Sequence, residues 1–383
     1  MSWGDEITTN CEHLKRCSRC ILPETTPNIT FDKDGVCNFC HSHIKVQYEG
    51  ETKLKELLYS HRKDSNKYDC VLGISGGRDS SYALLKLVKD YNLKVLAVNY
   101  ENPFTDPQAK TNIDNAVEAL NVDVVSFKLK NNIHERTFKH NFISWLRKPS
   151  PATIPMMCIA CKMILPHIIK YAKMYDVKCV VTGGNPYEYV SFKRELLNVS
   201  ADNDYRNLLI KSFGVKSFGG ITNEILKNPS YCHPMCIPTM ITGFLYGNPY
   251  SFGPRVLSPN IEFVDIFHYI PWQEEEVLSR IKQELKWESP SRFSSSWRFD
   301  CCVSHLKDLM YIKTLNMTEK DDFYSKMVRE CLITREKALI RLKDENKLQK
   351  SEIRKLLDSI GIKDISHLNG SKGEMILKEL LVE

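Results

Sequence analysis

The chain lacks the long apolar run that a signal peptide or a membrane-spanning helix requires. Residues 1–10 are polar and acidic rather than basic and then apolar. Strong charge of either sign is also missing, since the net charge is only +6 over 383 residues, and no stretch interleaves basic with aromatic residues. These absences predict a cytoplasmic protein without a membrane partner and disfavour a dedicated nucleic-acid-binding module. The mild positive charge suits an anionic substrate.

One glycine-rich loop lacks a lysine. Residues 70–74 are apolar and predict a buried strand, residues 75–80 read Ser-Gly-Gly-Arg-Asp-Ser, and residues 81–91 have helical periodicity. Adjacent glycines let several backbone N–H groups converge on one anion where a helix begins. The loop therefore predicts a phosphate site. The missing lysine excludes the G-x-x-x-x-G-K-[ST] loop, whose lysine reaches the γ-phosphate.

Each loop residue has an expected task. Asp79 predicts a Mg²⁺ ion, because a carboxylate beside phosphate is repelled unless a divalent cation lies between them. Arg78 is expected to stabilise negative charge during the reaction, so Asp79, Arg78 and Ser80 are the candidate catalytic residues. The candidate ligands of the phosphates are Ser75, Gly76, Gly77, Asp79, Ser80 and Ser81.

This string resembles the PP-loop of the ATP pyrophosphatases. In that superfamily the loop holds the pyrophosphate part of ATP while a substrate oxygen attacks the α-phosphate, and ammonia or sulfide then displaces AMP from the adenylated intermediate. The resemblance implies that ATP is cleaved to AMP and pyrophosphate. It also implies that backbone near Asn99 and Tyr100 holds the adenine.

Strands and helices alternate after the loop. Further strands are expected at residues 94–100, 122–129, 177–182 and 261–267, with helices at 109–120, 162–175 and 274–285. Such alternation predicts an α/β fold with a parallel sheet covered by helices on both faces, of the adenine nucleotide alpha hydrolase-like kind that the resemblance implies. Ligands lie at the carboxyl ends of such strands, where Gly183 and Gly184 are further candidate nucleotide-binding residues.

Two CxxC pairs stand near the start of the chain. Cys17 and Cys20 are followed, after sixteen intervening residues, by Cys37 and Cys40. Each pair can deliver two thiolates to adjacent corners of a tetrahedron, so the spacing predicts a structural Zn²⁺ site in a small ribbon built from turns.

The opening segment from Arg16 to Cys40, followed by the loop, resembles the N-acetyl sugar amidotransferase family, and the resemblance extends to about Gly184. It implies an enzyme that activates the acetamido oxygen of a nucleotide-linked sugar with ATP and converts the group to an acetamidino group. The ammonia would come from a glutaminase partner. The chain shows no glutaminase domain of its own, so a separate protein or free ammonia is the expected source.

A second cysteine set lies farther along the chain. Cys158 and Cys161 form a CxxC pair expected to open a helix, and Cys301 or Cys302 is the expected third ligand, with Cys232 as the substitute. Three cysteines predict a [4Fe-4S] cluster with one open iron. The layout resembles that of the PP-loop thiolation enzymes. It implies the alternative function, an ATP-dependent sulfurtransferase acting on a tRNA base or a small molecule.

The organisation expected from the sequence has three parts. Residues 1–50 form the zinc ribbon, and residues 51–300 form the PP-loop domain with a substrate insertion at about 186–258. Residues 301–383 form a helical C-terminal region. The main prediction is an ATP-pyrophosphatase-type amidotransferase.

Overall fold

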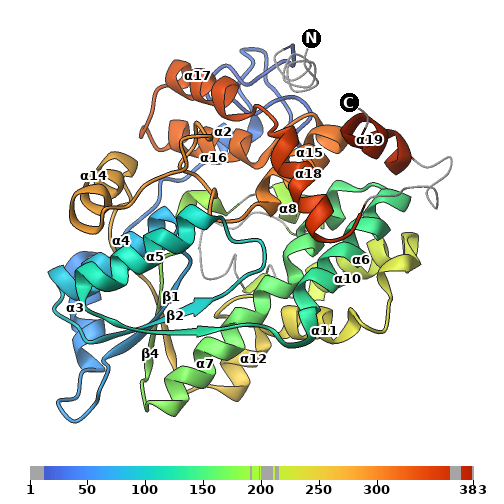
Figure 1. Ribbon diagram of the computed structural model, residues 1–383. Coiled ribbons are helices and arrows are strands. Elements are labelled where there is room, and N and C mark those ends of the chain that lie inside the picture. The colour runs from blue at the N-terminus through green and yellow to red at the C-terminus, as the bar shows by residue number, and fades with distance from the viewer. Residues whose placement is uncertain are drawn as a thin grey trace.

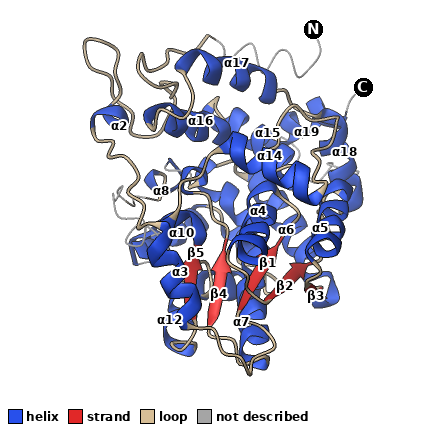
Figure 2. Ribbon diagram, turned by 90° about the vertical axis from the view of Figure 1, so that its left-hand side faces the viewer, coloured by secondary structure: helices blue, strands red, loops and turns tan. Residues whose placement is uncertain are grey.

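The computed structural model describes residues 13–189, 192–197, 199, 210–211, 215–362 and 372–381, so part of the expected substrate insertion lies outside the described residues. Its centre is a five-stranded, all-parallel sheet in the order β3-β2-β1-β4-β5, visible in Figure 2 as the red arrows. The predicted α/β fold class is confirmed. The strands are β1 (Cys70–Ile74), β2 (Val95–Tyr100), β3 (Asp123–Phe127), β4 (Cys179–Thr182) and β5 (Glu262–Asp265).

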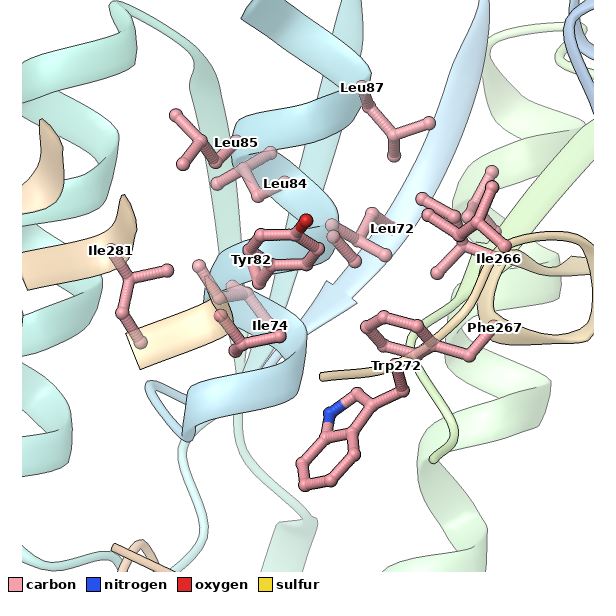
Figure 3. Packing of buried hydrophobic residues seen from close by; sticks show 14 of the residues in the cluster. Leu72, Ile74, Tyr82, Leu84, Leu85, Leu87, Ile266, Phe267, Trp272 and Ile281 are labelled. Atoms are coloured by element: carbon pink, nitrogen blue, oxygen red, sulfur yellow. The ribbon is translucent and has the colours of Figure 1, made fainter. Parts of the chain in front are cut away.

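Alternate side chains of β1 enter different apolar layers. Leu72 and Ile74 join the layer that includes Tyr82 and Leu84 of α4 and Ile281 of α14, which Figure 3 shows at close range. Val71 instead joins the layer formed with α7. This period of two places helices on both faces of the central strands. The helices in the first layer are α3 (Glu51–Ser60), α4 (Arg78–Leu85), α5 (Pro107–Leu120), α13 (Ile266–Tyr269), α14 (Glu274–Leu285), α16 (Glu319–Arg329) and α17 (Arg335–Glu345).

The edge strand β3 departs from the expectation of a sheet covered on both faces. Val124 in this strand is 39% exposed, and only Phe127 is buried. Because β3 pairs with β2 alone and Asp123, Val124 and Ser126 are exposed, much of this strand faces solvent.

A third apolar layer joins segments from distant parts of the sequence. The four N-terminal cysteines share it with Phe138 and Trp145 of α6 and with residues of α15, α18 and α19. Figure 1 shows these C-terminal helices, in orange to dark red, gathered on one side of the sheet layer. The helices outside the sheet layers are α2 (Asn38–His41), α6 (Ile133–Arg147), α8 (Phe192–Glu195), α10 (Val215–Lys227), α11 (Ile237–Leu245), α12 (Phe252–Leu257), α15 (Val303–Leu315), α18 (Lys350–Ser359) and α19 (Lys372–Leu381).

The helix that follows the glycine loop begins earlier than predicted. The sequence pattern gives residues 81–91, whereas α4 starts at Arg78 with Gly77 as its N-cap and continues into one wider turn, η1 (Lys86–Asp90). The loop is therefore shorter than expected. Its last residues already lie in the first turn of a helix, where unpaired N–H groups point toward the loop.

The segment that carries Cys158 and Cys161 also differs from its prediction. Both residues lie inside η3 (Pro151–Met163), a run of 3₁₀ turns that contains Pro155, and the α-helix α7 (Ile164–Met174) starts only after them. Proline cannot donate the backbone hydrogen bond that a regular helix needs, which explains the change of geometry. The two thiols therefore do not stand at the start of an α-helix.

The same segment corrects the expectation that no apolar run is long enough for a membrane. Residues 151–174 are long and apolar enough to span one by length and composition, with a mean hydropathy of 1.6 in the most apolar window. Half of that window is buried within the protein. Helices at the core of a soluble protein meet the same criterion, so this feature is weak evidence for a membrane span.

Candidate active site at the carboxyl edge of the sheet

The two glycine segments singled out in the sequence meet at the switch point of the sheet. The chain leaves β1 toward β2 on one side and later returns to form β4 on the other side of β1. A Cβ atom on Gly183, after β4, would lie 3.0 Å from the backbone oxygen of Asp79. Ligands of doubly wound sheets bind in the crevice at such a point. The structure thus brings Gly183 and the 75–80 loop together.

Gly76 has the backbone conformation that the loop requires. Its φ is +75°, and a Cβ atom there would lie 2.0 Å from the carbonyl oxygen of Ala109 in α5. The Gly76 carbonyl accepts hydrogen bonds from Trp287 Nε1 at 3.0 Å and from Asn112 Nδ2 at 3.3 Å. Only glycine fits this contact, because both the left-handed conformation and the close approach exclude a side chain.

Serines hold the loop in an open ring. Ser75 Oγ lies 3.2 Å from Ser80 Oγ and accepts a bond from the Gly77 N–H at 3.3 Å, and the Ser75 N–H donates to Ser80 Oγ at 3.3 Å. These groups are mutually paired and partly exposed, so an anion entering the ring can take over their donors. Ser81 differs, because its hydroxyl is fully buried in α4 and has no hydrogen-bond partner among the described residues.

Arg78 lies beneath the loop rather than on its surface. Its side chain is 2% exposed and pairs with Asp79 at 2.9 Å, with Glu274 at 2.8 Å and with Glu188 at 3.5 Å. The guanidinium also stacks on Trp272, whose indole N–H donates to Asp79 at 2.9 Å. Asp79 therefore already has an internal cation. In this position Arg78 can orient Asp79, Glu188 and Glu274. Its expected role in the reaction, to stabilise negative charge, stays a prediction.

Asp300 is the site residue that the sequence did not single out. Its Oδ2 atom would be 3.1 Å from a Cβ on Gly77, so the carboxyl group lies directly against the loop. Burial raises the pKa of Asp300, while the Ser75 hydroxyl and Arg298 favour its charged form. Burial likewise raises the pKa of Glu188 to about 7, with Asp79 and Asp300 adding to the shift. These carboxyl groups lie near the phosphate loop, and the Mg²⁺ ion expected there stays a prediction.

A backbone tether explains how a residue so late in the chain reaches the loop. The N–H of Asp106 donates to the Asp300 carbonyl at 3.1 Å, and the N–H of Cys302 donates to the Phe104 carbonyl at 2.9 Å. Thr105 and Cys301 form an isolated antiparallel bridge between these bonds. The segment after β2 thereby positions residues 300–302 at the carboxyl edge.

The predicted adenine residues lie at the end of β2 in different surroundings. Asn99 donates to Ser126 Oγ at 3.2 Å on an exposed surface. Tyr100 is buried, and its hydroxyl lies 2.7 Å from His134 Nδ1, while His134 Nε2 lies 3.6 Å from Cys161 Sγ. Tyr100 thus contacts the cysteine region through His134, a residue that the sequence pattern did not mark.

Three of the five cysteines named for the second set, Cys158, Cys161 and Cys301, influence one another electrostatically. Burial and then Cys158 raise the pKa of Cys161 to about 12, and burial, Cys161 and Cys158 together raise the pKa of Cys301. Asp300 contributes to both shifts, so this group adjoins the phosphate loop. Burial and the carboxylates of Asp106 and Glu352 raise the pKa of Cys302, while Arg292 lowers it, so Cys302 lies in another environment. The CxxC pair is among the causes that raise the pKa of Cys301, so Cys301 is the candidate third ligand, and the ligand set stays a prediction.

The four N-terminal cysteines converge as predicted. All are buried, and the Sγ atoms of Cys17 and Cys40, like those of Cys20 and Cys37, are 3.8 Å apart. A tetrahedral ion with Zn–S bonds of about 2.3 Å places its sulfur ligands about 3.8 Å apart, so the set fits zinc. The hydrogen bond from Cys17 lowers the pKa of Cys20 to about 6. The identity of the metal stays a prediction.

The zinc-type cluster is fixed to the C-terminal helices. Arg329 Nη1 lies 3.6 Å from Cys20 Sγ, and Arg335 Nε donates to the Cys20 carbonyl at 2.9 Å. These contacts attach the ribbon to α16 and α17. The role they indicate for the cluster is structural.

A protein-family model and one known protein each match part of this chain. A family model described as thiamine biosynthesis protein (ThiI) matches residues 66–206. An uncharacterized protein of Methanocaldococcus jannaschii is 28% identical over 174 residues, which are 44% of this chain and 58% of that protein. The chain therefore spans less than two thirds of the length of this relative. The family match covers the 75–80 loop and strands β1 to β4, which is the part of the chain that resembles the PP-loop ATP pyrophosphatases.

Two solved structures resemble the fold at low sequence identity. The U34-tRNA thiolase NcsA from Methanococcus maripaludis, solved with its [4Fe-4S] cluster, is 14% identical, with coverage of 92% of this chain and 90% of that one and a TM-score of 0.34. NMN synthetase from Francisella tularensis is 15% identical, with coverage of 63% of this chain and 97% of that one and a TM-score of 0.27. The finer assignment to the sugar amidotransferases stays a prediction.

Proposed function

We propose that the protein adenylates an amide or carbonyl oxygen of its substrate with ATP and replaces that oxygen with nitrogen from ammonia. The proposal rests on the anion-binding loop at residues 75–80, placed at the switch point and flanked by Asp79 and Asp300. The substrate we propose is a nucleotide-linked N-acetyl sugar, on the resemblance of residues 16–184. The three-part division of the chain at residues 50 and 300, and a cytoplasmic location, belong to the same proposal.

The proposed reaction has two steps. The substrate oxygen attacks the α-phosphorus of ATP, and pyrophosphate leaves into the loop formed by Gly76, Gly77 and the hydroxyls of Ser75 and Ser80. Ammonia then adds to the activated carbon, loses a proton and expels AMP. The loop N–H groups stabilise the charge that develops on the leaving group. Asp79 and Asp300 are the residues that would hold a Mg²⁺ ion, and such an ion would supply further neutralisation of the phosphates.

Product analysis tests the first step. Purified protein is incubated with ATP, Mg²⁺, ammonium and a panel of nucleotide-linked N-acetyl sugars, and the nucleotides are separated by chromatography. We expect AMP and pyrophosphate in equal amounts. Asp79→Asn should lose turnover, whereas the control Asp90→Asn, which alters a surface pair with Arg280, should keep it. Formation of ADP and phosphate by the wild type would refute the proposal.

A second candidate function is supported by Cys158, Cys161 and Cys301. Their mutual influence beside Asp300 suits a [4Fe-4S] cluster held by three cysteines, which would supply a sulfide nucleophile next to the adenylated substrate. A tRNA base or a small molecule would then be the acceptor, and no glutaminase would be needed.

Cys301 and Cys302 provide a matched pair of variants for this choice. The wild type, Cys301→Ser and Cys302→Ser are purified without oxygen and analysed for iron and acid-labile sulfide. Sulfur transfer predicts about four irons in the wild type and in Cys302→Ser and a marked loss in Cys301→Ser. Nitrogen transfer predicts iron-free protein in all three and ammonia-dependent turnover that survives Cys301→Ser.

A further inference from the structure

A second group of ligand side chains lies apart from the phosphate loop and from the ribbon. It combines His140 of α6 with His233 and Cys236 from the turn that leads into α11. One ligand atom of each residue lies within 4.8 Å of the others. Cys236 is buried, His140 is partly buried and His233 is exposed. The residues are 93 and 96 positions apart along the chain from His140, so only the tertiary fold brings them together.

We propose that His140, His233 and Cys236 bind a zinc ion. Two imidazoles and one thiolate form a donor set that zinc accepts, and three protein ligands leave one position for water. Zn–N bonds of about 2.0–2.1 Å and a Zn–S bond of about 2.3 Å require ligand atoms about 3.3–3.6 Å apart. A local closure of at most about 1.5 Å would bring the three atoms to that spacing, and an exposed turn can supply it.

The surroundings of His140 are those of an oriented ligand. Its Nε2 atom lies 2.7 Å from the carbonyl oxygen of Ser230, which holds the ring as a donor through that nitrogen. The lone pair then remains on Nδ1. Metal-binding histidines commonly fix their other N–H on a backbone carbonyl in this way. The His140 and His233 rings face each other at 4.5 Å between centroids and an angle of 45°.

Hydrogen bonds within residues 233–236 shape the turn that carries two of the three ligands. The Met235 N–H donates to His233 Nδ1 at 3.3 Å, and the Cys236 N–H donates to the His233 carbonyl at 2.8 Å. These bonds shape residues 233–236 into a compact turn, and the Thr137 and Thr239 hydroxyls, 3.4 Å apart, connect α6 with α11. A zinc ion would fasten this turn, and with it α11, to α6.

Zinc stoichiometry tests the site. The full-length wild type, His233→Ala and Cys236→Ser are supplied with excess zinc, desalted and analysed for bound metal by atomic emission. We expect both variants to carry one zinc per chain fewer than the wild type. His233 is exposed, so its replacement should leave the fold intact even where Cys236→Ser is unstable. Wild-type zinc content in His233→Ala would overturn the proposal.

A matched control separates ligation from the general loss of a histidine. His61 is partly buried and bonds Glu262 at 2.8 Å, and within the described part of the chain it belongs to no group of three ligand residues. His61→Ala should keep the full zinc content. A loss of zinc in His61→Ala equal to that in His233→Ala would show weak surface binding and would overturn the specific site. The ribbon zinc stays in every variant and serves as an internal reference.

Discussion

Replacement of Gly76 by alanine tests the geometry of the phosphate loop most directly. The new Cβ would lie 2.0 Å from the Ala109 carbonyl oxygen and 2.7 Å from its carbon, which are backbone atoms that no rotamer change can move. The loop cannot retreat, because the Gly76 carbonyl is held by Trp287 and Asn112. The substitution must therefore displace either the loop or α5.

The magnitude follows from two separate costs. A non-glycine residue at φ +75° costs about 1–2 kcal/mol, and forcing a methyl group into packed atoms costs about 1–3 kcal/mol more. Gly361 provides the matched control, since its φ is +67° but a Cβ there would meet only the flexible Lys139 Nζ at 3.4 Å. Gly361→Ala should thus show the first cost alone.

The assay combines denaturant unfolding with binding of a non-hydrolysable ATP analogue. We expect Gly76→Ala to lose about 2–5 kcal/mol of unfolding free energy and at least tenfold in nucleotide affinity, because the loop amides no longer converge. Gly361→Ala should lose about 1–2 kcal/mol and bind the nucleotide normally. Wild-type affinity in a folded Gly76→Ala protein would refute the assignment of this loop to phosphate binding.

Three further predictions concern charge and metal. Arg78→Ala leaves Asp79 and Glu274 without their buried cation and should destabilise the protein by about 3–5 kcal/mol. Denaturant unfolding measures this loss, and an unchanged unfolding midpoint would contradict the buried ion-pair network. Cys37→Ser should abolish zinc binding at the ribbon, because it removes one of the four thiolates. Zinc binding at such a site can contribute up to about 10 kcal/mol to folding. If metal analysis of the variant still found the ribbon zinc, the Cys₄ site would be contradicted. Burial lowers the pKa of His305 to about 4, so as pH falls the unfolded chain takes up a proton on this histidine before the folded protein does. Stability should therefore fall by about 1–3 kcal/mol as pH drops from about 6.5 to about 4. His305→Gln should reduce this pH dependence, and an unaltered pH profile in the variant would disprove the prediction.

The sequence by itself determined the parts of the site that depend on neighbours in the chain. The apolar run at residues 70–74 became β1 with the predicted ends, and the glycine pair became the turn before α4, because strand propensity and positive φ are local properties. The CxxC pairs at 17–20 and 37–40 also converge as expected, since each knuckle sets the position of two thiols by itself. Their spacing contained enough information to predict the site.

Only the tertiary structure decided which distant residues complete that site. Asp300 reaches the loop because residues 300–302 pair with residues 104–106, and no periodicity or spacing in the sequence encodes that pairing. The same tether places residue 301, in its antiparallel bridge with Thr105, at the sheet edge, while Cys302 is already the N-cap of α15. Which residues pair across two segments that lie far apart in the chain depends on long-range contacts, and local propensity carries no information about that pairing.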